Sequence, residues 1–261
     1  MRYNLVMFWR LMLLSLRAQM EYKLDFIASN FFRTLLAVTD FLMVAIIMIR
    51  FENIDGWSLY QVGLLFGVAS LALGIYRSLA SAVHNFEAVL INGDFDSLLI
   101  RPLPTLITLL TRRFELRWFG HMGQALVIII ICGRALSLST GAWVYVLVLP
   151  FWATCTLFGI SLATVTLGFW LTRIDEFLTF TMYAPAYASS FPLSVFPGWL
   201  KGIFFTGLPV AYMNYVPLQF LLGKGGDWTW LVLPPITAVI VFMLSYQFWL
   251  FGHSRYHSTG S

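Results

Sequence analysis

Long apolar runs separated by short polar breaks dominate the sequence. A membrane-spanning helix needs about 20 mainly apolar residues. Six runs meet this length, approximately at residues 30–49, 59–83, 116–136, 143–171, 177–197 and 229–251. The runs are continuous rather than alternating, which is typical of helices and not of a membrane β-barrel. The pattern therefore predicts an all-α membrane protein with six transmembrane helices.

The first 24 residues have a different pattern. Apolar side chains recur at helical spacing from Leu5 to Met20, while Arg10 and Arg17 share the opposite face. A helix of this kind lies in the membrane interface, with its arginines near the lipid headgroups. We therefore expect an interfacial amphipathic helix over residues 1–24. A short first span is the competing interpretation, and the two arginines disfavour it.

The segment 198–228 is apolar but is interrupted too often for one continuous span. Pro197 precedes it, and Pro209 and Pro217 break it. Non-helical backbone at membrane depth occurs only where protein or a cavity surrounds it. We expect a re-entrant outer hairpin between spans five and six, with arms at residues 199–206 and 209–222.

Individual residues inside the runs predict how the helices pack. The second run contains Gly63, Gly67 and Gly74, which allow another helix to approach closely. The first run contains Asp40 near its middle, and a carboxylate there costs about 2.5–3.5 kcal/mol. We therefore expect Asp40 to face other helices rather than lipid.

Composition agrees with a membrane protein. Of the 261 residues, 59% are hydrophobic and only 11% are charged, which is too few polar side chains to cover a soluble domain. The net charge is +4. With the N-terminus inside, the cytoplasmic side holds twelve of the 16 Lys and Arg residues. This bias predicts a protein of the cytoplasmic membrane with both termini in the cytoplasm, in contact with membrane lipids. The same bias explains the net positive charge, so the charge is no sign of binding to nucleic acid.

The break at residues 84–115 is predicted to be cytoplasmic, yet it is rich in apolar residues. Apolar side chains alternate with acidic ones around the turn Asn92-Gly93, and Arg101-Pro102 ends the second of two short amphipathic helices. Apolar faces should not stay in water. The helices either lie on the membrane or dock into a protein groove, and periodicity does not distinguish the two.

Candidate catalytic groups are few. Lys224 follows Gly223, but the earlier glycine of a phosphate-binding loop is replaced by Leu218 and no Ser or Thr follows the lysine. We therefore expect the chain to hold no ATP site of its own. His84, Asp94 and Asp96 form only weak acid–base or cation-binding motifs, and Asn85 and Asp94 stand where helix N-caps are expected. The spacing of the histidines and of the two cysteines predicts no metal site.

The residues from Asn85-Phe86-Glu87 through Asn92-Gly93-Asp94-Phe95-Asp96 to Arg101-Pro102-Leu103 resemble the cytoplasmic loop of ABC-2-type transporter permeases. Phe196-Pro197-Gly198-Trp199, Leu208-Pro209 and Tyr215-Val216-Pro217 resemble the same family. The resemblance covers essentially the whole chain and implies one permease domain, 1–261, of an ATP-driven exporter. It implies a second permease subunit, identical or homologous, and separate ATPase subunits that hold ATP and magnesium.

The resemblance also assigns an ATPase-coupling interface to the loop 84–115. Its expected members are Phe86, Glu87, Gly93, Asp94, Phe95, Asp96, Leu98, Leu99, Arg101 and Pro102. We expect Phe95 and Leu98 to be the apolar anchors of this interface.

Two questions stay open at this stage. The intramembrane ionisable residues either line a path or pair structurally, and they are Asp40, Arg77, His121 and Arg134. The competing functions are a membrane-embedded lipid-modifying enzyme that uses His84, Asp94 and Asp96, and a non-catalytic scaffold or channel.

Overall fold

The computed structural model describes residues 23–51, 54–171 and 173–256. The predicted interfacial helix at residues 1–24 lies almost entirely outside them. The described part is helical, apart from an isolated β-bridge between Ile54 and Trp57. The figures use the helix labels given below.

Five helical stretches in the described residues are long and apolar enough to cross a membrane. Their helices are α2 (Lys23–Phe51), α3 (Leu59–Leu79), α8 (Phe119–Ala135), α9 (Thr140–Thr166) and α14 (Leu233–Ser254). Short turns extend two of them, η1 (Leu116–Trp118) before α8 and η2 (Leu167–Phe169) after α9. Five of the predicted spans therefore have helices at the expected places.

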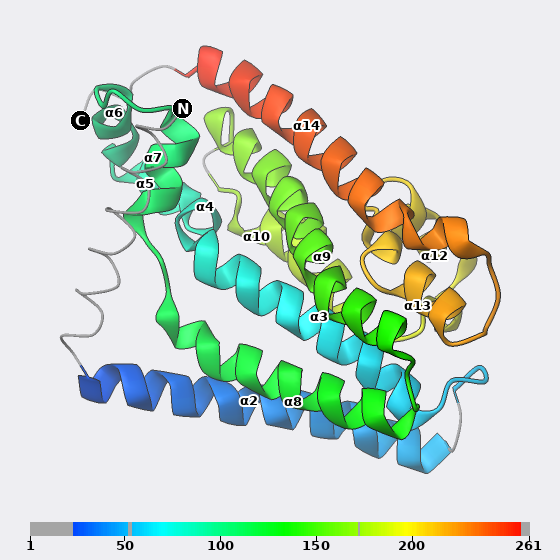
Figure 1. Ribbon diagram of the computed structural model, residues 1–261. Helices are drawn as coiled ribbons and strands as arrows, with labels where there is room; N and C mark the ends of the chain where they lie inside the picture. Colours follow the sequence, from blue (N-terminus) through cyan, green and yellow to red (C-terminus); the bar gives the residue numbers. More distant parts are fainter. Residues whose placement is uncertain (1–22, 52–53, 172, 257–261) are drawn as a thin grey trace.

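Helix α3 lies at the centre of the bundle. It packs against α8 on one side and α9 on the other, while α2 packs on α8 and α14 packs on α9 (Figure 1). In the most apolar window of α3, 78% of the residues are buried, against 17% in α2 and 22% in α14. The outer helices therefore offer most of their surface to lipid or to other proteins.

Glycines set the close contact between α3 and α8, as the sequence predicts. A Cβ atom added at Gly63 would lie 2.5 Å from Cys132 Sγ, and one at Gly67 would lie 2.7 Å from Ile129 Cγ1. A Cβ at Gly74 would lie 2.6 Å from Met122 Cγ. Only glycine leaves room for the second helix at these positions.

The loop between α3 and α8 folds into four short helices at one end of the bundle (Figure 1). They are α4 (Ser81–His84), α5 (Phe86–Ile91), α6 (Asp94–Leu99) and α7 (Thr105–Arg112). Gly93, at φ +69°, provides the left-handed turn between α5 and α6.

The segment predicted as the fifth span does not form one long helix. It contains α10 (Asp175–Leu178), the π-helical turn η3 (Thr179–Tyr183) and α11 (Ala184–Ala188), followed by η4 (Leu193–Val195). The helical run ends at Ala188, before Pro192 and Pro197, and a helix of this length is too short to span a bilayer. A sixth span thus stays a prediction.

The predicted hairpin region contains two short helices, α12 (Gly198–Phe205) and α13 (Tyr215–Leu221), with η5 (Val210–Tyr212) between them and η6 (Trp228–Leu231) after them. Pro197 precedes α12, Pro209 lies in the break, and Pro217 lies in the first turn of α13. The arms match the sequence prediction, whereas re-entry into the membrane stays a prediction.

The α3–α8 contact generates the first testable prediction. Gly67→Ala should lower the free energy of unfolding by about 1–3 kcal/mol, because its methyl group would overlap Ile129. Gly123→Ala in α8 is the matched control, since no atom lies within 4 Å of its added Cβ. The control should be neutral or slightly stabilising. Thermal unfolding of both purified variants measures the difference, and equal melting temperatures would contradict the close contact.

Candidate coupling surface and membrane cavities

An aromatic cluster fixes α5 and α6 to the ends of two long helices. The rings of Phe86 and Phe95 lie 5.6 Å apart, centroid to centroid. Phe86 lies 5.5 Å from Phe169 of η2 and 5.2 Å from Trp249 of α14. Phe95 lies 5.3 Å from Phe169 and 4.7 Å from Tyr256. Edge-to-face contacts of this kind contribute about 0.5–1.5 kcal/mol each beyond simple burial.

This cluster changes the expected role of the loop's apolar residues. Phe86, Phe95 and Leu98 are fully buried within the chain itself. The expectation that Phe95 and Leu98 are surface anchors is therefore wrong. Amphipathic spacing shows that a helix has an apolar face, and here α14 and η2 cover that face.

Other residues of the same segment are exposed. Ile100 keeps 86% of its surface exposed, and Ile91 and Leu99 are also exposed. Arg101 and Pro102 follow directly and are exposed too. We call these five exposed residues, which are apolar apart from one positive charge, the tip surface: Ile91, Leu99, Ile100, Arg101 and Pro102.

Glu87 connects α5 to the first turn of α10. Its Oε2 accepts hydrogen bonds from the backbone N–H of Ile174 at 2.6 Å and of Asp175 at 2.9 Å. A carboxylate in this position satisfies backbone donors that a helix start leaves free and interacts favourably with the helix dipole. The loop is thereby tied to the segment that leads into η3 and α11.

Two further contacts hold the short helices in place. Asp94 of α6 forms a 3.0 Å ion pair with Arg112 of α7. The Oγ1 atom of Thr105, at the start of α7, lies 3.1 Å from the Nε2 atom of His253 in α14. With the aromatic cluster, these contacts make α5, α6 and α7 one unit attached to the ends of α9, α10 and α14.

The residues named for a competing catalytic site serve other contacts. His84 Nε2 lies 3.1 Å from the Tyr183 hydroxyl, whereas Asp94 pairs with Arg112 and Asp96 lies beside Tyr256. Burial and the nearby charge of Arg77 lower the pKa of His84 to about 3, so the ring is neutral at pH 7. Within the described residues no group of three His, Cys, Asp or Glu side chains is placed to hold a metal ion.

Asn85 stands at the N-cap position of α5, as expected, but makes no side-chain capping bond, whereas the N-cap expected at Asp94 is wrong. The Asn85 side chain accepts no capping bond and instead donates to the Ser81 carbonyl oxygen at 2.6 Å. The residue before α6 is Gly93, so Asp94 lies inside the first turn. Short helices that are held by tertiary contacts do not require side-chain caps.

The four intramembrane ionisable residues have different environments. Asp40 is exposed on α2, so the expectation that it faces other helices of this chain is wrong. Helix α2 packs only one face, against α8 and α3. His121 Nε2 lies 3.2 Å from the Ser70 carbonyl oxygen, which is a structural pairing. Arg134 is exposed in the last turn of α8.

Arg77 belongs to a charged cluster at the loop end of the bundle. Glu115, almost fully buried, accepts two hydrogen bonds from Arg117 at 2.6 and 2.7 Å and pairs with Arg113 at 3.1 Å. Burial alone raises the pKa of Glu115, but the hydrogen bonds and positive charges outweigh it and lower the pKa to about 2. Trp118 adds a hydrogen bond from its indole N–H at 3.2 Å. Glu115 is therefore ionised at pH 7.

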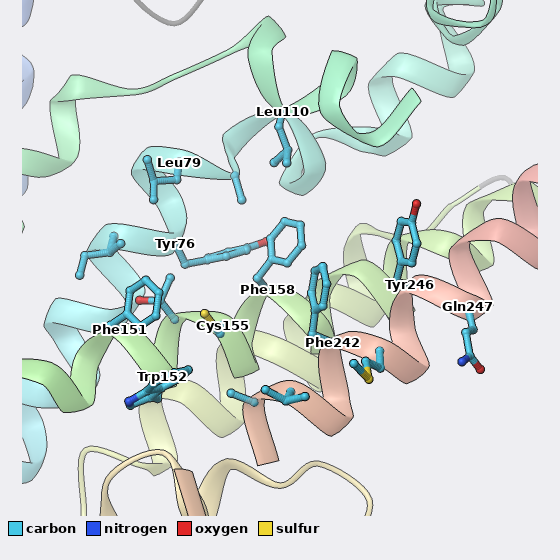
Figure 2. A pocket seen from close by; sticks show the side chains of 16 residues that line it. Tyr76, Leu79, Leu110, Phe151, Trp152, Cys155, Phe158, Phe242, Tyr246 and Gln247 are labelled. Atoms are coloured by element: carbon cyan, nitrogen blue, oxygen red, sulfur yellow. The ribbon is translucent and has the colours of Figure 1, made fainter. Parts of the chain in front are cut away.

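An apolar cavity of about 910 Å³ opens between α3, α7, α9 and α14. The rings of Tyr76, Phe158, Phe242 and Tyr246 line it, and Leu110 of α7 closes one side (Figure 2). Phe158 stacks on Phe242, and Phe242 stacks on Tyr246. This lining suits an apolar ligand and offers no pair of groups for acid–base chemistry.

A second cavity, of about 540 Å³, has a more polar lining. Hydroxyl groups from α9, η3 and α14 face it, together with the Thr206–Pro209 break of the hairpin region. No ionisable side chain lines it. Such a cavity can form hydrogen bonds with a neutral polar group.

The comparisons with known proteins agree with this arrangement. The family described as ABC-2 family transporter protein matches residues 34–260, which is most of the chain. No curated protein and no solved structure matches. The match includes part of α2, the other four long helices, the loop with its short helices and the hairpin region. The chain belongs to the ABC-2 family of membrane transporter proteins.

Proposed function

We propose that this chain is the permease subunit of an ATP-driven exporter in the cytoplasmic membrane, with both termini in the cytoplasm. It pairs with a second permease, identical or homologous, to form the substrate pathway. Separate ATPase subunits bind ATP and magnesium. In this proposal residues 177–197 make the fifth of six crossings, and residues 198–228 form a re-entrant hairpin on the outer side.

The observation that carries the proposal is the attachment of α5 and α6 to three other helices. The aromatic cluster joins them to η2 and α14, and Glu87 joins them to α10. Densely packed side chains transmit displacement because they cannot absorb it. A displacement of the loop therefore moves the ends of α9, α10 and α14 together. Coupling to an ATPase requires such a concerted movement.

The tip surface supplies the contact with the ATPase. Exposed apolar residues on a short helix pair indicate a protein-binding surface when they lie outside the lipid-facing helices. Ile91, Leu99 and Ile100 provide the apolar centre, and Arg101 lies at its edge. The buried residues Phe86, Phe95 and Leu98 support this surface from behind.

Asp40 supports the pairing with a second permease. A carboxylate in the middle of an exposed membrane helix is costly unless another protein or a polar path covers it. Tyr187 of α11, also exposed, lies within electrostatic range of Asp40, so α2 and α11 contribute to one surface. We place the second permease on this surface.

The tip surface gives a direct test of ATPase binding. Replacing Leu99 and Ile100 together with Asp should weaken binding of the ATPase subunit about thirtyfold, the effect of losing roughly 2 kcal/mol at a central contact. Asn92→Asp with Ser97→Asp is the matched control, because it adds the same two charges at exposed polar positions of the loop, outside the tip surface. Co-purification and ATP-driven export in proteoliposomes measure the effect. Normal assembly of the double variant would refute the tip surface.

A buried residue of the same helices should behave differently. Phe95→Ala should destabilise the permease itself by about 3–5 kcal/mol, because the ring is fully buried in the aromatic cluster. Thermal unfolding without the ATPase detects this loss. An unchanged melting temperature would show that Phe95 does not belong to the core.

A variant of Glu87 tests whether motion of the loop reaches α10, separately from whether the ATPase binds. Glu87→Ala removes both hydrogen bonds to the start of α10. We expect assembly and ATP hydrolysis to persist while export falls several-fold. Glu176→Ala is the control, since it removes a nearby exposed charge from α10. Equal export by the two variants would mean that the Glu87 contact does not carry the motion.

Cysteine cross-linking tests the surface around Asp40. Leu36 and Met43 are exposed on α2 and share the Asp40 stripe by helical spacing. In a variant without Cys132 and Cys155, a single cysteine at either position should form a disulfide between two permeases or cross-link to the homologous subunit. Met243→Cys on the exposed face of α14 should not. Cross-linking through α14 alone would place the partner elsewhere.

A further inference from the structure

Two arginines from different helices lie close to the indole ring of Trp118. The guanidinium carbon of Arg33, in α2, lies 4.4 Å from the ring centroid. That of Arg77, in the last turn of α3, lies 5.1 Å from the same centroid and 5.8 Å from the ring of Tyr183. Residues of α2, α3 and η1 thus meet at one tryptophan. We call Arg33, Arg77 and Trp118 the arginine clamp.

The charge around the arginine clamp is not balanced within the described residues. The carboxylate of Glu115 is already engaged by Arg113 at 3.1 Å and by Arg117 at 2.6 Å. Neither Arg33 nor Arg77 forms an ion pair with any described residue. Four guanidinium groups therefore lie around Glu115, and Asp25 of α2 adds only one further negative charge, near Arg117.

Arg77 also has unused hydrogen-bond donors. Its Nε and Nη1 atoms are buried and have no hydrogen-bond partner among the described residues. Cation–π contacts with Trp118 and Tyr183 stabilise the charge but accept none of its N–H bonds. A buried guanidinium normally has its donors satisfied, because the loss of water is otherwise uncompensated. The clamp is therefore built to receive an anion.

The shape of guanidinium groups favours an oxyanion, and phosphate binds two such planar groups well. The surroundings favour a phosphate that carries acyl chains. Leu36 lies one turn from Arg33 along α2, Phe119 follows Trp118, and both are exposed and apolar. Basic pockets between membrane helices near a membrane surface are typical binding sites for anionic lipid headgroups.

We propose that the arginine clamp binds the phosphate of an anionic phospholipid, with the acyl chains on the exposed apolar side chains beside it. The lipid joins α2 to α3 and to the start of α8 at the loop end of the bundle. This site goes beyond the proposed export function, because it requires only that the chain lies in a bilayer.

Native mass spectrometry of the full chain in detergent, titrated with phosphatidylglycerol or phosphatidylcholine, tests the site. The unmodified chain should bind phosphatidylglycerol more tightly. Each lost guanidinium should weaken that binding about fivefold, so Arg33→Gln with Arg77→Gln should weaken it about twenty-five-fold. Arg255→Gln is the matched control, because it removes an arginine that lies outside the clamp, beside Phe251. The control should bind like the unmodified chain.

Two further measurements separate the remaining outcomes. Thermal unfolding shows whether the double variant is folded. If the double variant is unfolded, Arg33→Gln alone is tested in its place, with an expected fivefold loss of affinity for phosphatidylglycerol. Inorganic phosphate as competitor distinguishes a lipid headgroup from a free phosphate. The lipid proposal is overturned if phosphatidylcholine binds equally well, if the clamp variants and the control lose affinity equally, or if inorganic phosphate displaces phosphatidylglycerol at a similar concentration.

Discussion

The close contact between α3 and α8 determines how the rest of the molecule is arranged. Lipid provides little driving force for helix association, so membrane helices associate where their surfaces fit. Three glycines of α3 admit Cys132, Ile129 and Met122 side chains from α8. With α9 on its other side, α3 is enclosed along its length. Its last turn, with Arg77, and the loop that follows it are therefore held at fixed positions.

From that fixed end, the loop 84–115 uses its own apolar residues to become part of the bundle. Phe86 and Phe95 enter a cluster with Phe169, Trp249 and Tyr256. Their burial fixes the orientation of α5 and α6, and it leaves Ile91, Leu99 and Ile100 outside. One set of loop residues thus attaches the loop to the bundle, and another set remains available to a partner.

The sequence predicted the parts of this structure that depend on local pattern. Apolar runs of spanning length located the five long helices, and the glycines of the second run indicated the helix contact. It did not predict what covers an apolar face, because periodicity carries no information about the neighbour. Phe95 was therefore misplaced on the surface. The Glu87 contact with Ile174 joins residues 87 positions apart, and a local sequence pattern does not predict a hydrogen bond over that separation.

The fifth predicted span shows another limit. It contains no charged residue, yet the chain forms a π-helical turn over Thr179–Tyr183 and leaves the helix after Ala188. Pro185 lies at the start of α11, and Pro192 and Pro197 follow. Hydropathy measures the tendency to enter a membrane, whereas proline positions determine whether the helix is continuous.

Three groups that the described residues leave without compensation lie in separate places. The apolar tip surface is at the end of the short helices, Asp40 is midway along α2, and the free donors of Arg77 are at the end of α3. An apolar patch, a carboxylate within a membrane span and a buried guanidinium need different partners. We propose a protein surface, a second membrane subunit and a phosphate as their respective partners. The same energetic rule, that exposed apolar and buried polar groups require a partner, thus accounts for each contact that we assign to the assembled transporter.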